Sequence, residues 1–301
     1  MQDVLVTCRT QSKELCHYPQ IQGHYLAKQL ARLGLQAEFR PLPLPQSYPC
    51  RVAISSEYPA EMDWFERHML GPLSDIAADR LFGLMAYTLG SRDHPARPSL
   101  EWFAQRGGVL CCGLEDPPAP WESWIGVGVD TDVVPPPAEV RHRVVFDPVG
   151  DVPESVPVDP VELGRIRRRV PGVRLAACGR GNPPPSAGFD EWLPYGRAHP
   201  AHVQAALGAA FALVPMKHES LGLMLAEAQV AGVCIVHRPY FVKDWMLCPE
   251  ADVPYDPELP GGLAEALVEA AHRDPKVIAE QARAAFDFSA VASRARAAIG
   301  L

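Results

Sequence analysis

Several features that mark particular protein classes are missing from the 301-residue sequence. No apolar run approaches the roughly 18–20 residues that cross a membrane. The first residues lack the basic stretch of a signal peptide. The eight cysteines form no Cys-x-x-Cys pair, so we expect reduced, mostly buried thiols and no metal site. Together these absences favour a cytoplasmic protein without a membrane span.

The motifs of several enzyme classes are also missing. We find no G-x-S-x-G nucleophile elbow, no H-E-x-x-H zinc site, no phosphate-binding P-loop and no G-x-G-x-x-G dinucleotide motif. No pair of carboxylates is identifiable as a glycosidase acid and nucleophile, because the sequence does not give their separation in space.

An excess of basic residues is lacking as well. The 28 Lys and Arg residues are outnumbered by 36 Asp and Glu residues, and the formal net charge is −8. This balance does not indicate a nucleic-acid partner, although a local basic surface would still permit one.

The composition is that of an ordinary globular protein. Hydrophobic residues make up 48% of the chain and charged residues 21%. The length suffices for two domains with sizeable cores. The 32 prolines cluster between periodic segments, where they punctuate connections.

Residues 211–236 form the most informative stretch. An apolar run, a polar loop, a helix that stops at Gly232 and a second apolar run follow one another, which predicts a strand–helix–strand unit of a parallel sheet. Glu219 and Glu227 are about two helical turns apart and can face the same side. An ordinary βα unit of another Rossmann-like fold is the alternative.

This stretch resembles the donor-site motif of retaining GT-B glycosyltransferases, above all family 4. That motif reads Glu-(Ser/Gly)-Phe-Gly, then a Glu-Ala pair, a small residue and Gly. The matching residues are Glu219, Ser220, Leu221, Gly222, Glu227, Ala228, Ala231 and Gly232. Leu221 replaces the usual Phe.

Two further segments are similar to the same family. Residues 128–131 match the end of the family's first domain, and residues 251–301 match its C-terminal part. The resemblance implies an α/β GT-B fold, with two Rossmann-like domains facing a central cleft. We expect an acceptor-side domain at residues 1–136, a nucleotide-sugar domain at 137–285 and a last helix at 286–301 that packs back on the first domain.

One departure from the family concerns the donor diphosphate. Family members carry an Arg and a Lys-Gly pair after the first strand of the second domain, whereas residues 147–151 here read Asp-Pro-Val-Gly-Asp. The two basic residues are missing. Lys217, Arg180 and Arg9 are our candidates to replace them.

The resemblance also implies roles for individual residues. Glu227 would hold the ribose hydroxyls, and Glu219 would contact the donor sugar. The backbone amides of 220–222 would bind phosphate or sugar oxygens at a helix start. Tyr195 is a candidate stacking surface for the base. His218, next to Lys217, completes the expected donor side.

Candidate residues in the first domain are weaker. Asp93 and His94 follow the apolar run 81–89, and parallel α/β sheets gather their sites just past strand ends. A surface turn is the alternative for this polar cluster. His17 and His24 are further candidates for an acceptor ligand or base.

The expected function is therefore transfer of a sugar from a nucleoside-diphosphate sugar, UDP-linked by preference, with retained configuration and without a metal or other cofactor. The acceptor is open: a small molecule, a glycan or a modified DNA base. A GT-B epimerase or hydrolase and a degenerate GT-B binding module are the alternatives. The missing basic residues favour the degenerate module.

Overall fold

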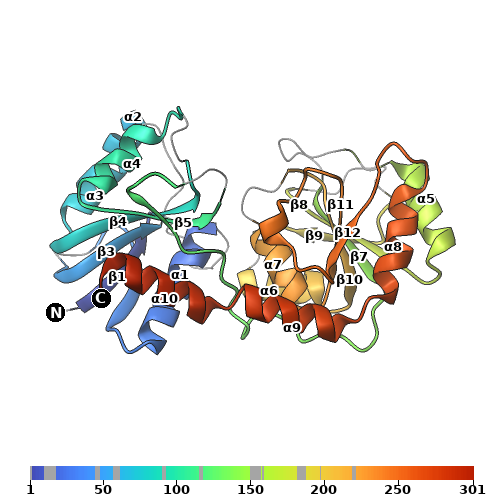
Figure 1. Cartoon of the computed structure of the whole chain (residues 1–301). Helices are drawn as coiled ribbons and strands as arrows, with labels where there is room; N and C mark the ends of the chain where they lie inside the picture. Colours follow the sequence, from blue (N-terminus) through green and yellow to red (C-terminus); the bar gives the residue numbers. More distant parts are fainter. Residues whose placement is uncertain are drawn as a thin grey trace. The chain divides into compact units, whose positions relative to one another are not determined.

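The computed structural model describes residues 2–9, 18–44, 48–56, 62–89, 93–114, 118–149, 157, 159–181, 188–196, 198–218 and 222–301. The chain divides into two compact units (Figure 1). Unit 1 contains Met1–Gly128 and Phe288–Leu301, and unit 2 contains Val129–Asp287. The first boundary falls before the proline-rich stretch at 135–137, where we had expected the domains to meet.

Unit 1 is built on a parallel six-stranded sheet with the order β2-β1-β3-β4-β5-β6. Its strands are β1 (Gln2–Cys8), β2 (Ala37–Pro41), β3 (Cys50–Ser56), β4 (Ala78–Tyr87), β5 (Gly107–Gly113) and β6 (Glu122–Trp124). The chain runs from β1 to one neighbour, β2, and then resumes on the other side at β3. This reversal creates a topological switch point between β1 and β3.

The described helices of unit 1 are α1 (Tyr18–Arg32), α2 (Met62–Phe65), the π-helical turn η1 (Glu66–Leu70), α3 (Gly71–Ser74), α4 (Arg97–Ala104) and, from the end of the chain, α10 (Phe288–Ile299). α10 packs on α1 and β5. Its Arg294 donates from Nε to the carbonyl of Ile125 at 2.6 Å. The ring of Phe288 lies where a side chain at Gly128 would stand, 2.6 Å from the Cβ position. These contacts explain why the last residues belong with unit 1.

Unit 2 also contains a parallel six-stranded sheet, with the order β12-β11-β10-β7-β8-β9. Its strands are β7 (Arg143–Val149), β8 (Arg174–Gly179), β9 (Glu191–Pro194), β10 (Ala210–Pro215), β11 (Cys234–His237) and β12 (Asp252–Pro254). β10 and β11 are buried along their whole length. Such continuous apolar strands are typical of a sheet covered on both faces.

Helices cover the two faces of this sheet. α5 (Pro160–Arg169) packs against α8 (Gly262–His272), and α6 (His199–Leu207) packs against α7 (Leu223–Val230), which also contacts α9 (Pro275–Ala285). The connection through α5 leads from β7 toward β9, whereas those through α6 and α7 lead in the opposite direction. Because parallel crossovers are right-handed, α5 and α6 lie on opposite faces.

Local signals fix the ends of these helices. Asp159 and Asp274 each cap a helix by accepting a backbone N–H at 2.8 Å, and a proline follows each of them. Gly232 stops α7 in the left-handed region at φ 78°, where a Cβ would lie 2.5 Å from the carbonyl oxygen of Pro275. The strand–helix–strand unit that the sequence predicts around this glycine is confirmed.

The cysteines are placed as the sequence indicates. Seven cysteines lie in the described part of the chain, and all of them are buried. Burial raises the pKa of the Cys50 and Cys248 thiols to about 11, so these side chains are packing groups rather than nucleophiles. In the part of the chain that the structure describes, no helix is long and apolar enough to cross a membrane.

Candidate functional site

The site in unit 2 lies at the switch point between β7 and β10. From these two neighbouring strands the chain leaves in opposite directions, to β8 and to β11. Open parallel sheets bind ligands outside the carboxyl ends of strands at such a point. Asp147 of β7 and Met216, directly after β10, meet there, with the Met216 N–H donating to the Asp147 carbonyl at 2.8 Å.

A carboxylate, a phenol and an ammonium group gather at this edge. The Tyr195 hydroxyl donates to the Asp147 carboxylate, and Lys217 acts on the same carboxylate electrostatically. Loss of hydration raises the pKa of Asp147 to about 6, although the Tyr195 hydrogen bond and the positive charge of Lys217 both act to lower that pKa. Asp147 therefore stands ionised at neutral pH at the strand end where a basic residue was expected.

Tyr195 is held in this cluster from both sides. Its backbone N–H donates to the Gly179 carbonyl at 2.8 Å, and its ring lies edge-on to His202 with centroids 5.7 Å apart. The side chain remains exposed. The ring thus stands at the carboxyl edge where base stacking was predicted, but its hydroxyl is committed to Asp147.

Glu227 forms a second, buried cluster with His199. Glu227 Oε1 lies 2.6 Å from His199 Nε2, and the two side chains are only 3% and 7% exposed. α7 presents Glu227, and His199 is the first residue of α6. The carboxylate that the resemblance assigns to ribose is therefore covered by an imidazole. Sequence reasoning missed His199, and the only available signal was its place at a helix start.

The start of α7 supplies backbone donors. Gly222 precedes the helix with φ 69°, a left-handed conformation that favours glycine, and a Cβ there would lie 3.1 Å from Met246 Sδ. The residues immediately before it in the predicted motif, Glu219, Ser220 and Leu221, lie outside the described residues.

The other predicted donor-side residues occupy turns at the same sheet edge. Arg180 is exposed directly after β8, and His218 is exposed beside the half-buried Lys217 after β10. Gly181 follows Arg180 at φ 68° and accepts a hydrogen bond from Trp192 Nε1 at 3.1 Å. The turn of residues 179–181 is thus fixed to the following strand, β9.

The candidates from the first half of the chain belong to unit 1. Arg9 follows β1 at the switch point of that unit, with its guanidinium 5.2 Å from the centre of the Trp64 ring. His94 Nδ1 accepts the Ala96 N–H at 3.1 Å in the turn before α4, and Asp93 beside it is exposed. The His94 contact supports the turn interpretation.

The remaining candidates of the first domain are His24 and His17. The ring of His24 packs edge-on against Tyr25 and Phe39, as a packing residue of α1 would. His17 lies outside the described residues. Within the ranges given above, no three His, Cys, Asp or Glu side chains gather in a way that would hold a metal ion.

Comparison with solved structures identifies the architecture. Sucrose-phosphate synthase from Thermosynechococcus elongatus is similar with a TM-score of 0.63 and 13% identity, over 98% of this chain and 97% of that one. A glycosyltransferase from Rickettsia africae is similar with a TM-score of 0.61 and 9% identity, over 99% of this chain and 98% of that one. WaaG, a glycosyltransferase involved in lipopolysaccharide biosynthesis, is similar with a TM-score of 0.59 and 12% identity, over 97% of this chain and 98% of that one.

The fold is GT-B. This confirms the predicted fold class, with its two parallel sheets and covering helices. At these identities the likeness establishes the fold, while the chemistry has to be argued from the site. No protein-family model matches the sequence, and no curated protein matches it either.

Proposed function

We propose that this protein is a retaining, metal-independent glycosyltransferase that uses a nucleoside-diphosphate sugar, with UDP as the preferred nucleotide. The observation that carries the proposal is the correspondence of nearly the whole chain, both units included, with structures of glycosyltransferases. The polar clusters at the carboxyl edge of the unit 2 sheet support it, because they lie where GT-B sheets place a nucleotide.

The reaction requires stabilisation of a diphosphate leaving group. The bond between the anomeric carbon and the phosphate oxygen breaks, a bond to the acceptor hydroxyl oxygen forms on the same face, and the acceptor proton passes to the leaving phosphate. Lys217 and the backbone N–H groups at the start of α7 would offset the developing negative charge. Because Asp147 lies close enough to interact with Lys217, the ammonium charge is partly offset before the donor binds.

Glu227 would bind the ribose hydroxyls, since a carboxylate accepts two O–H groups of a vicinal diol. Its present partner, His199, keeps the carboxylate oriented in a buried setting. Glu219 would contact hydroxyls of the transferred sugar, and Tyr195 would stack against the base. The acceptor is a hydroxyl compound that unit 1 would select, with Asp93, His94 and Arg9 as the candidate contacts. We place the reaction in the cytoplasm.

A binding module without turnover is the second candidate. The observation that favours it is Asp147, an anionic group at the strand end where a phosphate ligand was expected. A carboxylate at this position repels a diphosphate and weakens the case for leaving-group stabilisation.

A two-step experiment separates these functions. Thermal unfolding with a panel of nucleoside diphosphates and their sugars comes first, and we expect stabilisation by one of them. Release of free sugar from that donor then identifies a transferase that hydrolyses its donor slowly, whereas binding without release identifies the module. No stabilisation by any member of the panel would contradict the transferase function. The anomeric configuration of the product, measured by NMR, tests retention.

A further inference from the structure

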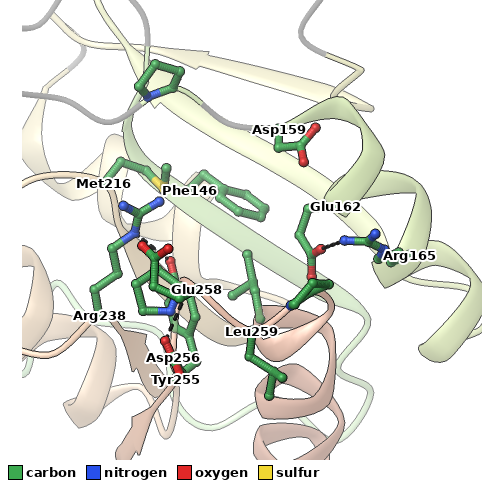
Figure 2. A pocket seen from close by; sticks show the side chains of 14 residues that line it. Phe146, Asp159, Glu162, Arg165, Met216, Arg238, Tyr255, Asp256, Glu258 and Leu259 are labelled. Carbon is green, nitrogen blue, oxygen red and sulfur yellow. Dashed lines mark hydrogen bonds and ion pairs between the residues drawn. The ribbon is translucent and has the colours of Figure 1, made fainter.

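A pocket opens at the same switch point, on the face of the unit 2 sheet opposite to the Asp147 and Tyr195 cluster. It has a volume of about 290 Å³ and reaches down to Phe146 and Met216 (Figure 2). Its walls come from α5, from the start of α8 and from the loops after β11 and β12. Since successive residues of a strand alternate between faces, Phe146 lines this pocket while Asp147 belongs to the cluster with Tyr195.

Two acidic residues of the lining are already engaged by the protein. Asp159 caps α5 through the Val161 N–H at 2.8 Å. Glu162 accepts the Ala264 N–H at 3.2 Å and pairs with Arg165 at 2.9 Å. The bonds of Glu162 tie α5 to α8 and neutralise its carboxylate. This side of the pocket is therefore structural. The ligand chemistry must come from the opposite side, where Figure 2 shows Arg238.

Arg238 presents a guanidinium group that is fixed from behind. Its Nε donates to the Tyr255 hydroxyl at 3.0 Å, and its Cζ lies 5.6 Å from the centre of the Phe241 ring. Among the described residues, no hydrogen bond or ion pair engages its two terminal nitrogens. A half-buried guanidinium with both terminal nitrogens available suits a phosphate group, which accepts two parallel N–H bonds.

Next to Arg238 the pocket offers hydroxyl acceptors. Asp256 Oδ1 takes the Glu258 N–H at 2.9 Å, which fixes the turn after β12 and leaves the second carboxylate oxygen. Glu258 is exposed at the rim. Leu259 beside it is 58% exposed, an apolar side chain that a bound sugar ring would cover. Two carboxylates disfavour a bare anion but accept O–H groups readily.

We propose that this pocket binds a monosaccharide phosphate, with the phosphate on Arg238 and sugar hydroxyls on Asp256 and Glu258. The volume, just below the roughly 300–1,000 Å³ of ordinary ligand pockets, holds such a group but not a whole nucleotide sugar. This proposal goes beyond the transferase function, because it is argued from the lining of the pocket alone. The same chemistry occurs in a free sugar phosphate and in the glycosyl-phosphate end of a nucleotide sugar.

Calorimetric titration of the full chain tests the proposal. Glucose 1-phosphate and glucose 6-phosphate are the probes, with glucose and inorganic phosphate as reference ligands. We expect at least one sugar phosphate to bind about tenfold or more tightly than either reference ligand, because the binding free energies of the phosphate and hydroxyl contacts add. Sugar phosphates that bind no more tightly than inorganic phosphate would overturn the proposal.

Three variants locate the binding. Arg238→Gln should weaken the sugar phosphate by about tenfold or more, and Arg168→Gln, an exposed arginine of α5 outside the lining, should not change it. Glu258→Ala alters an exposed side chain and should weaken the sugar phosphate but not inorganic phosphate. Glu258→Ala decides whether the pocket binds the sugar phosphate if Arg238→Gln fails to fold. Unchanged sugar-phosphate affinity in either variant that folds would refute the assignment.

Competition with UDP-glucose distinguishes the two sources of the ligand. If saturating UDP-glucose displaces the sugar phosphate, the pocket holds the glycosyl-phosphate end of the donor, and the assignment of that end to Glu219 and the start of α7 is wrong. If both bind together, or UDP-glucose does not bind, the pocket serves a free sugar phosphate. Failure of UDP-glucose to bind therefore counts against UDP-glucose as the donor. If UDP-glucose binds but no sugar phosphate does, the result counts against the sugar-phosphate pocket.

Discussion

Glu227 Oε1 and His199 Nε2 are 2.6 Å apart in an environment that excludes almost all water from both side chains. A buried carboxylate needs a compensating partner, and here the neighbouring imidazole comes from the first residue of a different helix. The pair links α7 to α6 and holds the carboxylate in one orientation.

Removing His199 should therefore destabilise the protein through the carboxylate left behind. We expect His199→Ala to lower the free energy of unfolding by about 3 kcal/mol, because an unpaired buried charge remains. In the double variant His199→Ala/Glu227→Gln the loss should be smaller, since the remaining group is neutral. Denaturant unfolding of the wild-type chain, the two single variants and the double variant measures the coupling free energy between the two side chains. Additive effects would show that the pair contributes nothing of its own.

The raised pKa of Asp147 predicts how the free energy of unfolding depends on pH. Its pKa is raised to about 6 from an ordinary value of 3.8, so the folded state binds more protons than the unfolded state between these values. The contribution of this group to stability is present below pH 3.8 and is lost as the pH rises through 6. Asp147→Asn should thus stabilise the protein by about 1–2 kcal/mol at pH 8 and have little effect at pH 4.

Tyr195→Phe is the matched variant for this measurement. It removes the hydroxyl that donates to the ionised carboxylate, so it should destabilise the protein at pH 8 more than at pH 4. Chemical unfolding at the two pH values gives both comparisons. If the two variants shift stability equally at both pH values, the titration of Asp147 does not explain the difference.

The end of α7 provides a test of backbone geometry. Gly232 and Gly172 have nearly the same dihedral, φ 78° and 77°, but only Gly232 is crowded, with the Pro275 carbonyl oxygen 2.5 Å from a Cβ. Gly172→Ala should cost about 1–2 kcal/mol from the left-handed backbone alone. Gly232→Ala should cost about 2 kcal/mol more, because the start of α9 has to move. Equal losses of melting temperature would contradict the close contact.

The strand–helix–strand unit around α7 was predictable because its signals are local. Two apolar runs, a glycine stop and short spacings specify β10, α7 and β11 without any knowledge of distant residues. The same holds for the Asp-Pro starts of α5 and α9, where the capping residue and the following proline are neighbours in the chain.

The site clusters depend on contacts between distant segments. Asp147 and Tyr195 are separated by 48 positions, and they meet only because β8 stands between β7 and β9 and carries both strand ends to one edge. The sequence alone shows that the basic residues expected after residue 146 are missing. It does not show that the carboxylate found there is bound by a tyrosine and lies near a lysine. Arg238 was missed for a similar reason, since only the fold brings it to the pocket of Phe146 and Met216.

We propose that this GT-B protein transfers sugar from a nucleoside-diphosphate donor bound at unit 2. The most direct measurement is release of nucleoside diphosphate from a panel of UDP-, GDP- and ADP-sugars by the wild-type chain and by Glu227→Ala. We predict slow release from one donor, UDP-linked by preference, and a loss of nucleotide affinity of about tenfold or more in the variant. No release from any donor would contradict the transferase function, and equal nucleotide affinity in both proteins would contradict the role of Glu227 in binding the ribose.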